Sequence, residues 1–452
     1  MKRLKSGLYL LVVFTFLLTA CAGPQAPTAA APQPTTAEGA QPTEGQAEPT
    51  MAGANPPSGE QIALQLWGFS GEYEFLPQVI EEFNQQNPNI TVEITDIPED
   101  DYVTKIDTAL LAKEPPDLGY VYEQRWIETG AFAPLDASLQ AEGINVDDFN
   151  PGVMSNCINE GKVYCIGTYT GAVLLYYNKA LFDAAGVPYP SSTEPMTIDE
   201  YAVMIKQLSK PSDDINQRIW GGDAGAAYWW IERTTMFNED GRTVEGFIND
   251  ESTIHFYDVV TQLPKDGSVM SSSEAELLQG TDLLAQGKLA TTIVDNVVAI
   301  PSFEAANIAY GAAPPPVEKE GDLPYAPTWS DSYGVFADSQ HPEEAKKFLA
   351  YLIKRGNEIR LEQGTLPLNL TLAAEKNYGA DNEGRKETLE AIQVAGRPVV
   401  EIPGFWDIMG PLEDGFAQMV EDGRPATDVL NEIAPDMQDL ADQNWETWDS
   451  IQ

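Results

Sequence analysis

The chain has 452 residues, 43% of them hydrophobic and 10% aromatic, which is enough apolar material for more than one core. Its 70 acidic and 26 basic residues give a formal net charge of −44, which argues against nucleic acid or an anionic lipid surface as a partner. The two histidines, His255 and His341, lie far apart in the sequence, which speaks against a histidine-based zinc centre.

The first residues have the organisation of a secretory signal. Three cations within the first five residues precede an apolar run from Leu8 to Leu18, which is short for a membrane span. The run ends in Leu-Thr-Ala-Cys, and this ending resembles the bacterial lipobox. The resemblance implies that residues 1–20 are a signal peptide and that Cys21 carries diacylglycerol; a cysteine placed there by chance is the alternative.

Residues 21–59 predict a tether. They are dominated by Pro, Ala, Thr, Gln and Gly and contain almost no large apolar side chains. Such a segment buries too little surface to offset the entropy of ordering it, so we expect it to be disordered. The sequence therefore predicts a lipid-anchored globular body held outside the cytoplasmic membrane.

The body opens with strands and helices in alternation. Ile62, Leu64 and Leu66 alternate as in a strand, and Phe75, Val79 and Phe83 follow at helical spacing. Strand, helix and strand patterns continue at residues 89–97, 100–116 and 117–123. This order predicts a parallel sheet covered by helices, with ligands bound beyond the carboxyl ends of its strands. Those ends are Trp67 and the corner that contains Glu123 and Gln124.

Two cysteines suit an oxidising location. Cys157 and Cys165 flank a turn signal, and residues 160–162 are expected to form a hairpin loop that lets the two thiols meet. We predict a disulfide, with two free buried thiols as the alternative.

The remaining elements are a buried strand at 172–177 with a helix that stops at Gly186, and further helices and short strands. A strand is expected to end at Asp295 and Asn296, and the tail is expected to be helical from Phe405 onward. The other patterns are helices at 197–210, 249–263 and 341–354 and a strand at 308–316.

The ordered set of these pieces resembles the extracellular solute-binding proteins of carbohydrate ABC importers, the family that includes maltose-binding protein. The match runs from about residue 60 to the end and is most specific at "LLYYNKALFDAAGV", Leu174–Val187. Other matching pieces are "FNQQNPNITVEI", "PPDLGYVY", "MTIDEYAVMIKQL", "LLAQGKLATTIVDN", "YGAAPPP" and "PEEAKKFLAYLI".

The resemblance implies an α/β, two-lobed periplasmic-binding-protein fold, each lobe a mainly parallel sheet flanked by helices, joined by hinge crossovers. The N-terminal lobe would comprise 60–170 and 334–372, and the C-terminal lobe 171–333 and 373–452. The first crossover would run through Tyr169 to Tyr177, where Gly171 tolerates the dihedral change of closure.

Sugars are held by aromatic rings against their faces and by planar polar groups at their rims. Tryptophans at loop ends and polar side chains at strand ends are therefore the candidate ligand-binding residues, and the resemblance adds weight to Trp406 and to one of the adjacent Trp229 and Trp230. The full set is Trp67, Glu123, Gln124, Tyr169, Trp229, Trp230, Asp295, Asn296, Trp329, Asp331 and Trp406.

We therefore expect a monomeric, lipid-anchored binding protein that takes up a sugar or oligosaccharide, hands it to an ABC permease in the membrane, uses no cofactor and catalyses nothing. A binder of a polyamine, peptide or polyol is one alternative. A secreted glycosidase is another, since 70 acids guarantee candidate carboxylate pairs without a motif to single one out.

Overall fold

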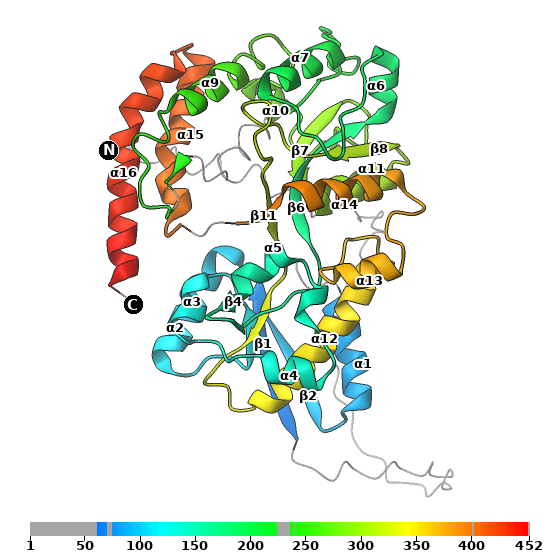
Figure 1. Cartoon of the computed structure of the whole chain (residues 1–452), viewed down its shortest axis with the longest axis vertical. Coiled ribbons are helices and arrows are strands. Elements are labelled where there is room, and N and C mark those ends of the chain that lie inside the picture. Colours follow the sequence, from blue (N-terminus) through cyan, green and yellow to red (C-terminus); the bar gives the residue numbers. More distant parts are fainter. Residues whose placement is uncertain (1–60, 70–74, 224–235, 239, 400–401, 451–452) are drawn as a thin grey trace, which may run out of the picture. The chain divides into compact units, whose positions relative to one another are not determined.

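The structure of the chain is a computed structural model that describes residues 61–69, 75–223, 236–238, 240–399 and 402–450 (Figure 1). The chain divides into two units. One comprises Met1–Glu60 and Leu278–Thr281, of which only the last four are described, in a turn closed by a 2.9 Å hydrogen bond from the Thr281 N–H to the Leu278 carbonyl. The other comprises Gln61–Leu277 and Asp282–Gln452 and contains both main sheets.

The first sheet has four strands among the described residues, in the order β10-β3-β1-β2. β1 (Ile62–Phe69) pairs in parallel with β2 (Ile90–Ile97) and with β3 (Leu118–Tyr120). β10 (Tyr333–Val335) runs antiparallel to β3 and brings in a segment more than 200 positions later in the chain. The predicted parallel sheet is confirmed here, with one antiparallel strand at its edge.

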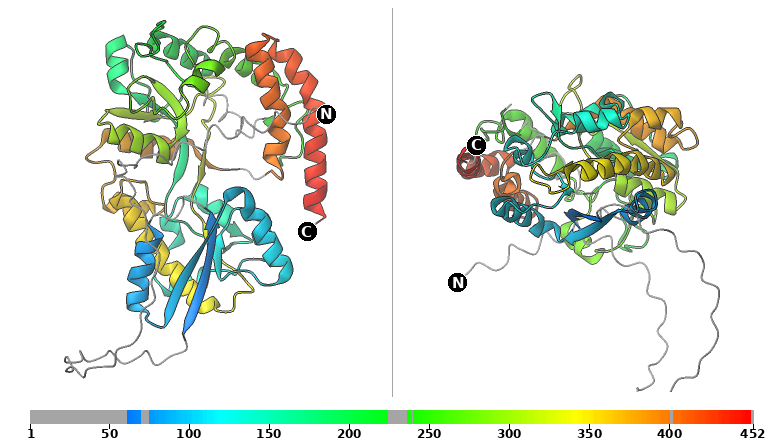
Figure 2. Two further views of the ribbon diagram at one scale, coloured as in Figure 1. Left: turned by 180° about the vertical axis from the view of Figure 1, so that it is seen from behind. Right: turned by 90° about the horizontal axis from the view of Figure 1, so that it is seen from below.

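Helices cover this sheet because their apolar residues fall on one face. α1 (Leu76–Gln86) buries Leu76, Val79 and Phe83, two of which belong to the spacing of Phe75, Val79 and Phe83 that predicted the helix. Phe83 meets Phe348 of α12 (Pro342–Glu362) with ring centroids 5.1 Å apart, and the left view of Figure 2 shows the two helices side by side. The other helices of this part are α2 (Glu99–Ala112), α3 (Gln124–Glu128), α4 (Asp136–Ala141), α5 (Pro151–Met154) and α13 (Leu370–Glu375), with short 3-10 turns at Val146–Asp148 and Ser155–Cys157.

The second sheet is built around β6 (Gly171–Asn178), every residue of which is buried. β6 runs antiparallel to β7 (Thr291–Asp295), β8 (Tyr310–Ala313) and β9 (Ala326–Trp329). Among the described strands of this sheet, only β11 (Gly396–Pro398) and β9 pair in parallel. The prediction of a mainly parallel sheet in each lobe is therefore wrong for the second one. That prediction came from the resemblance. The strand–helix alternation of the first sheet does not continue here, because more than one helix separates β6 from its next partner.

The helices around the second sheet begin and end at recognisable signals. Thr197 caps α7 (Ile198–Leu208) in a reciprocal capping box with Glu200, and Gly186 ends α6 (Lys179–Ala185) in the left-handed conformation. The tail forms two helices, α15 (Phe405–Glu421) and α16 (Ala426–Asp449), which pack on each other. The remaining helices are α9 (Glu251–Val260), α10 (Ser272–Leu277), α11 (Asn296–Ala305) and α14 (Glu383–Ala395).

Two separate clusters of buried hydrophobic side chains accompany the two sheets. The members of one lie between residues 64 and 166 and between 333 and 368. The members of the other lie between residues 173 and 313 and between 402 and 441. Each cluster thus draws on two stretches of chain that are distant in sequence, which is the pattern of a chain that passes back and forth between two cores.

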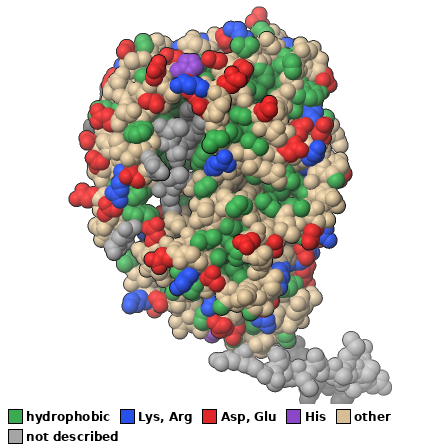
Figure 3. Space-filling view, in the orientation of Figure 1, with side chains coloured by type: hydrophobic (Ala, Val, Ile, Leu, Met, Phe, Trp, Pro, Cys, Tyr) green, Lys and Arg blue, Asp and Glu red, His purple; other side chains and the backbone are tan. Residues whose placement is uncertain are grey.

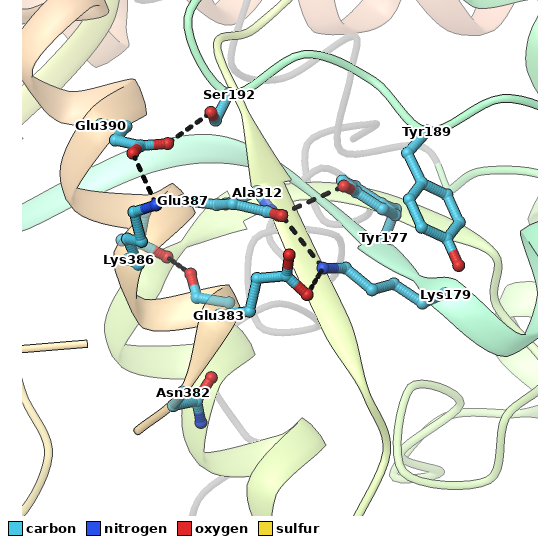
Figure 4. A network of polar contacts seen from close by, with 12 residues as sticks. Tyr177, Lys179, Tyr189, Ser192, Ala312, Asn382, Glu383, Lys386, Glu387 and Glu390 are labelled. Atoms are coloured by element: carbon cyan, nitrogen blue, oxygen red, sulfur yellow. Dashed lines mark hydrogen bonds and ion pairs between the residues drawn. The ribbon is translucent and has the colours of Figure 1, made fainter. Parts of the chain in front are cut away.

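A partly buried ion-pair network fixes α14 onto the second sheet (Figure 4). The Lys179 ammonium, at the first position of α6, lies 2.7 Å from Glu383 and 3.0 Å from Glu387 of α14. The other oxygen of Glu387 accepts hydrogen bonds from the Tyr177 hydroxyl and from the Ala312 N–H. The network joins α14 to β6 and β8, although more than 60 residues separate the end of β8 from the start of α14.

Acidic side chains are spread over the face of the molecule drawn in Figure 3 and do not gather into one patch on it. In the described part of the chain, no helix has both the length and the apolar character that crossing a bilayer requires.

Candidate functional site

Trp67 lies near the carboxyl end of β1, in the first sheet, and packs against the first core. Trp67 pairs with Thr95 and Gly119, and its carbonyl accepts a 3.3 Å hydrogen bond from the buried Tyr102 hydroxyl. β1 continues two residues past Trp67, so the expectation that Trp67 ends the strand is wrong. Its indole is partly buried against the first core and partly exposed.

The corner after β3 combines a ring with carboxylates. The Tyr122 side chain is exposed, and Glu123 and Gln124 lie at the start of α3 with partly exposed side chains. Arg125 lies 2.7 Å from Asp107 and 3.4 Å from Glu123, so its charge is shared between two acids. Burial raises the pKa of the Glu123 carboxyl above its ordinary value, although Arg125 acts in the opposite direction.

Two further residues at this corner were not among the sequence candidates. Although Tyr122 as a whole is exposed, desolvation of its hydroxyl raises the pKa of Tyr122 to about 12, and this hydroxyl shares a hydrogen bond with Glu99 at the start of α2. Burial also raises the pKa of Glu99, with the Asp100 charge as the second cause. Both could have been found from the sequence, because Tyr122 and Glu99 each lie two residues past the end of a strand, β3 and β2, at the carboxyl edge of the predicted parallel sheet.

One end of the second sheet carries three of the candidates. Asp295 of β7 pairs with Val173, and Trp329 of β9 pairs with Gly171, so both lie beside the first residues of β6. Asn296 follows Asp295 directly and begins α11. The Trp329 indole is partly buried and packs against the second core.

Asn296 serves the backbone and is nearly inaccessible. Its side-chain oxygen accepts from the Ala172 N–H at 2.8 Å, and its amide nitrogen donates to the Thr170 carbonyl at 3.0 Å. Both ends of the amide are thereby occupied by the start of β6. The Asp295 carboxylate accepts from the Val297 N–H at 3.0 Å and caps α11. The expected strand end is therefore one residue earlier, at Asp295.

Asp331 is also a structural residue. Its carboxylate has no exposed surface and accepts hydrogen bonds from both the N–H and the hydroxyl of Thr168. The Ser330 hydroxyl donates to it at 3.0 Å, and the Arg360 guanidinium lies 3.3 Å away. With its oxygens enclosed in this way, Asp331 is removed from the set of ligand candidates.

Tyr169 lies between the same elements. Only 5% of the residue is exposed, and the Arg360 guanidinium lies 4.9 Å from the centre of its ring and 4.4 Å from that of Phe75. The next residue, Thr170, donates its N–H to the Leu366 carbonyl at 2.9 Å. Three stretches, at 167–171, 330–333 and 366–369, are thus hydrogen-bonded to one another or to the same helix, and we call them the crossing segments.

The crossing segments connect the two candidate edges. The Tyr120 hydroxyl donates to the Ser330 carbonyl at 3.0 Å, and the Val121 N–H donates to the Ser332 carbonyl at 2.7 Å. Ser330 directly follows Trp329. The corner with Tyr122 and Glu123 and the sheet end with Trp329 and Asp295 are therefore bound to the same short stretch of backbone.

Trp406 is the most exposed tryptophan that the structure describes among the candidates. It stands in the first turn of α15, 56% exposed, with its ring edge-on to Phe405 at a centroid distance of 5.1 Å. Nothing in the described residues buries its indole as core. Trp229 and Trp230 lie outside the described residues.

Cys157 and Cys165 form a disulfide, as predicted, with both residues buried. The hairpin loop is shorter than expected. It consists of Glu160 and Gly161, both with positive φ, and Lys162 already belongs to β5 (Lys162–Val163), which pairs with β4 (Ile158–Asn159). Cys21 lies outside the described residues.

The described candidates thus offer aromatic surfaces and carboxylate or amide groups, which suits a ligand with apolar faces and a polar rim. Within the described ranges, no three His, Cys, Asp or Glu side chains are grouped so as to hold a metal ion.

The sequence pattern of the bacterial extracellular solute-binding proteins matches residues 69–359, and the chain belongs to this family. A protein of Brucella abortus (strain 2308), named as a binding protein, is 26% identical over 378 residues, which cover 79% of this chain and 87% of its own length.

Solved structures agree with this assignment. An ABC substrate-binding protein from Listeria monocytogenes in complex with cycloalternan shares 21% identity and a TM-score of 0.67, covering 84% of this chain and 99% of its own. The sugar-binding protein MalE from Xanthomonas citri shares 17% identity and a TM-score of 0.66, with coverages of 86% and 99%. At these identities the likeness establishes the two-lobed α/β fold.

Proposed function

We propose that this protein captures a sugar or oligosaccharide and delivers it to an ABC permease in the membrane. The observation that carries the proposal is the joining of two candidate edges, one with Tyr122 and Glu123 and one with Trp329 and Asp295, through the backbone of Ser330 and Ser332. Family membership and two similar structures, one with cycloalternan bound and one named as sugar-binding, support the same ligand class.

The proposed mechanism is closure of two lobes on the ligand. The N-terminal lobe comprises 60–170 and 334–372, and the C-terminal lobe 171–333 and 373–452. The crossing segments link the two cores, so they are where a change of lobe orientation has to be absorbed. A ligand that touches both lobes stabilises the closed arrangement by its extra contacts there and shifts the equilibrium toward it.

The ligand contacts are proposed from the candidates other than Tyr169, Asn296 and Asp331, and Asp295 is the buried member of this set. Trp67, Tyr122, Trp329 and Trp406 supply rings for the sugar faces, and Glu123, Gln124 and Asp295 supply polar groups for its hydroxyls. Trp229 and Trp230 remain proposed contacts on the strength of the sequence alone. No group in this set is asked to transfer a proton or break a bond, so the ligand is released unchanged.

The proposal includes the cell envelope. Cleavage before Cys21 and lipidation of its thiol tether a monomeric body to the outer face of the cytoplasmic membrane, where it meets the permease. Extraction of the expressed protein into a detergent phase, and its loss on Cys21→Ala substitution, would test the anchor.

A polyamine is the second candidate ligand, and a specific observation favours it. Glu99 and Glu123 both interact with Tyr122, with Asp100 also acting on it, and Arg125 pairs with Asp107 and Glu123. Aromatic rings together with converging carboxylates also suit an organic cation.

Thermal unfolding against a panel of mono- and oligosaccharides, polyols and polyamines tests the proposal. A ligand at a hundred times its Kd adds about 2.7 kcal/mol to the stability of the folded state, which raises Tm by a few degrees at most. A rise with one class of sugar supports sugar capture. A rise in Tm with polyamines alone supports the second candidate ligand. If no compound of the panel raises Tm and the protein releases reducing ends from a glycan, both binding proposals are overturned.

A further inference from the structure

Gly171 and Trp329 face each other across the antiparallel pair of β6 and β9. A Cβ added at Gly171 would lie 2.7 Å from Nε1, 2.8 Å from Cε2 and 3.1 Å from Cδ1 of the indole. Real Cβ atoms essentially never lie within 3.0 Å of such atoms, so the indole rests on the glycine backbone in space that any other side chain would fill. An aromatic ring that covers a cross-strand glycine also shields the backbone there from water.

The backbone on either side of Gly171 is fixed. The Thr170 N–H bonds to the Leu366 carbonyl, the Thr170 carbonyl accepts from Asn296, and the Ala172 N–H donates to the same Asn296 amide. Gly171 has no positive φ, so its conformation does not require glycine. A side chain at this position would therefore displace the indole of Trp329, because the strand cannot yield.

Trp329 is held from its own side as well. Thr328 donates its hydroxyl to the Arg397 carbonyl, and the residue after Trp329, Ser330, accepts from the Tyr120 hydroxyl. With the strand fixed at both neighbours, the indole changes position chiefly by rotating about its own side-chain bonds. The contact with Gly171 limits that rotation.

We propose that Gly171 is a positioning residue for ligand binding and acts by seating the Trp329 indole in the orientation that stacks on the sugar. This inference rests on the proposed function, since it assigns Trp329 as a sugar platform. It also gives Gly171 a role other than flexibility: the glycine is required for space, and the hinge motion takes place elsewhere in the crossing segments.

A double-mutant cycle of Gly171→Ala and Trp329→Ala in the full chain tests the proposal. The affinity for the best sugar of the panel is measured by calorimetric titration. Trp329→Ala is expected to weaken binding about tenfold or more, as for a stacked aromatic anchor, and Gly171→Ala about fivefold or more. In the Trp329→Ala background the added methyl group has no indole to displace, so Gly171→Ala is expected to have no further effect on Kd.

This lack of further effect separates positioning from a general structural role. If Gly171 served backbone flexibility, Gly171→Ala would weaken binding by the same factor with or without the indole, and that result would overturn the proposal. Unchanged affinity of the single Gly171→Ala variant would overturn it as well.

The outcome is decided even if Gly171→Ala does not fold. If the added methyl group clashes with the indole, the double variant should fold even where Gly171→Ala does not. Failure of both variants to fold would show that this clash is not the cause. If the wild type binds no sugar, the proposed function fails and the platform role with it. The contact between Gly171 and the Trp329 indole can then still be tested through stability, because Gly171→Ala should lower Tm in the wild type and not in Trp329→Ala.

Discussion

The carboxylate of Asp331 accepts hydrogen bonds from both the N–H and the hydroxyl of Thr168, a residue 163 positions earlier in the chain, with 2.6 Å between the amide nitrogen and Oδ1. The carboxylate is fully buried, and Arg360 reaches it from α12. One acidic side chain thereby binds two crossing segments and a helix of the first core to each other. We therefore expect Asp331 to set the geometry of the crossing and to make no contact with a ligand.

Asp331→Asn is therefore expected to lower stability. In the variant, an NH₂ donor replaces one carboxylate oxygen and faces the donors of Thr168 and Arg360. The Arg360 guanidinium also loses its charge partner. Breaking a buried pair in this way costs about 3 kcal/mol in the free energy of unfolding. Urea unfolding measures the loss, and Asp338→Asn at an exposed position is the control, with a change within about 0.5 kcal/mol. An unchanged unfolding midpoint with weakened sugar binding would return Asp331 to the ligand site.

Lys179→Met is expected to be destabilising for a related reason. The Lys179 side chain is 10% exposed, and its removal leaves the carboxylate of Glu387, 15% exposed, without a charge partner. The expected loss is about 3 kcal/mol, measured by denaturant unfolding. Lys386→Met on α14, the helix of Glu383 and Glu387, is the matched control, because Lys386 is 64% exposed and its ion pair with Glu390 is worth little (Figure 4). Equal effects of the two substitutions would contradict the importance of the network.

Trp406→Ala is expected to weaken sugar binding while the fold is retained. A stacked aromatic anchor contributes about 1–3 kcal/mol to binding, and the exposure of Trp406 means that little core packing is lost. Calorimetric titration gives the affinity, and unfolding gives the stability. Leu323→Ala, which removes another exposed apolar side chain, is the control and should leave affinity unchanged. Unaltered affinity of Trp406→Ala would take Trp406 out of the site.

Glu123→Gln is expected to change stability in a pH-dependent way. Burial raises the pKa of Glu123 in the folded state, so the charged carboxylate is a cost at pH values above that pKa. The cost disappears as the pH falls through the folded pKa toward the ordinary value for glutamate, about 4.3. The Tm of Glu123→Gln should therefore exceed that of the wild type at pH 7, and the difference should shrink toward zero near pH 4. A lower Tm for the variant at pH 7 would mean that the ion pair with Arg125 dominates. The exposed Glu114→Gln serves as the control.

Much of the fold could be predicted because its signals are local. The spacing of Phe75, Val79 and Phe83 predicted α1, and Thr197 with Glu200 marked the start of α7. The antiparallel second sheet could not be predicted in this way. Its pairings join β6 to strands that follow after more than 100 residues, and the composition of a buried strand does not reveal the direction of its neighbours.

The site was harder to predict than the fold, because the role of a polar residue depends on what tertiary contact leaves exposed. Asn296 and Asp331 have the residue types and strand-end positions of ligand contacts, yet their polar atoms bind backbone and side chains from distant segments. Glu99 was missed because it stands at a helix start, although it follows β2 at the same carboxyl edge of the predicted sheet as Tyr122.

Isothermal titration of the folded protein with neutral oligosaccharides, with polyamines as competitors, tests sugar capture most directly. The account predicts saturable one-to-one binding of at least one sugar class, no competition by polyamines, and recovery of the sugar chemically unchanged. Absence of saturable binding by any sugar while a polyamine binds, or recovery of a cleaved sugar, would contradict it.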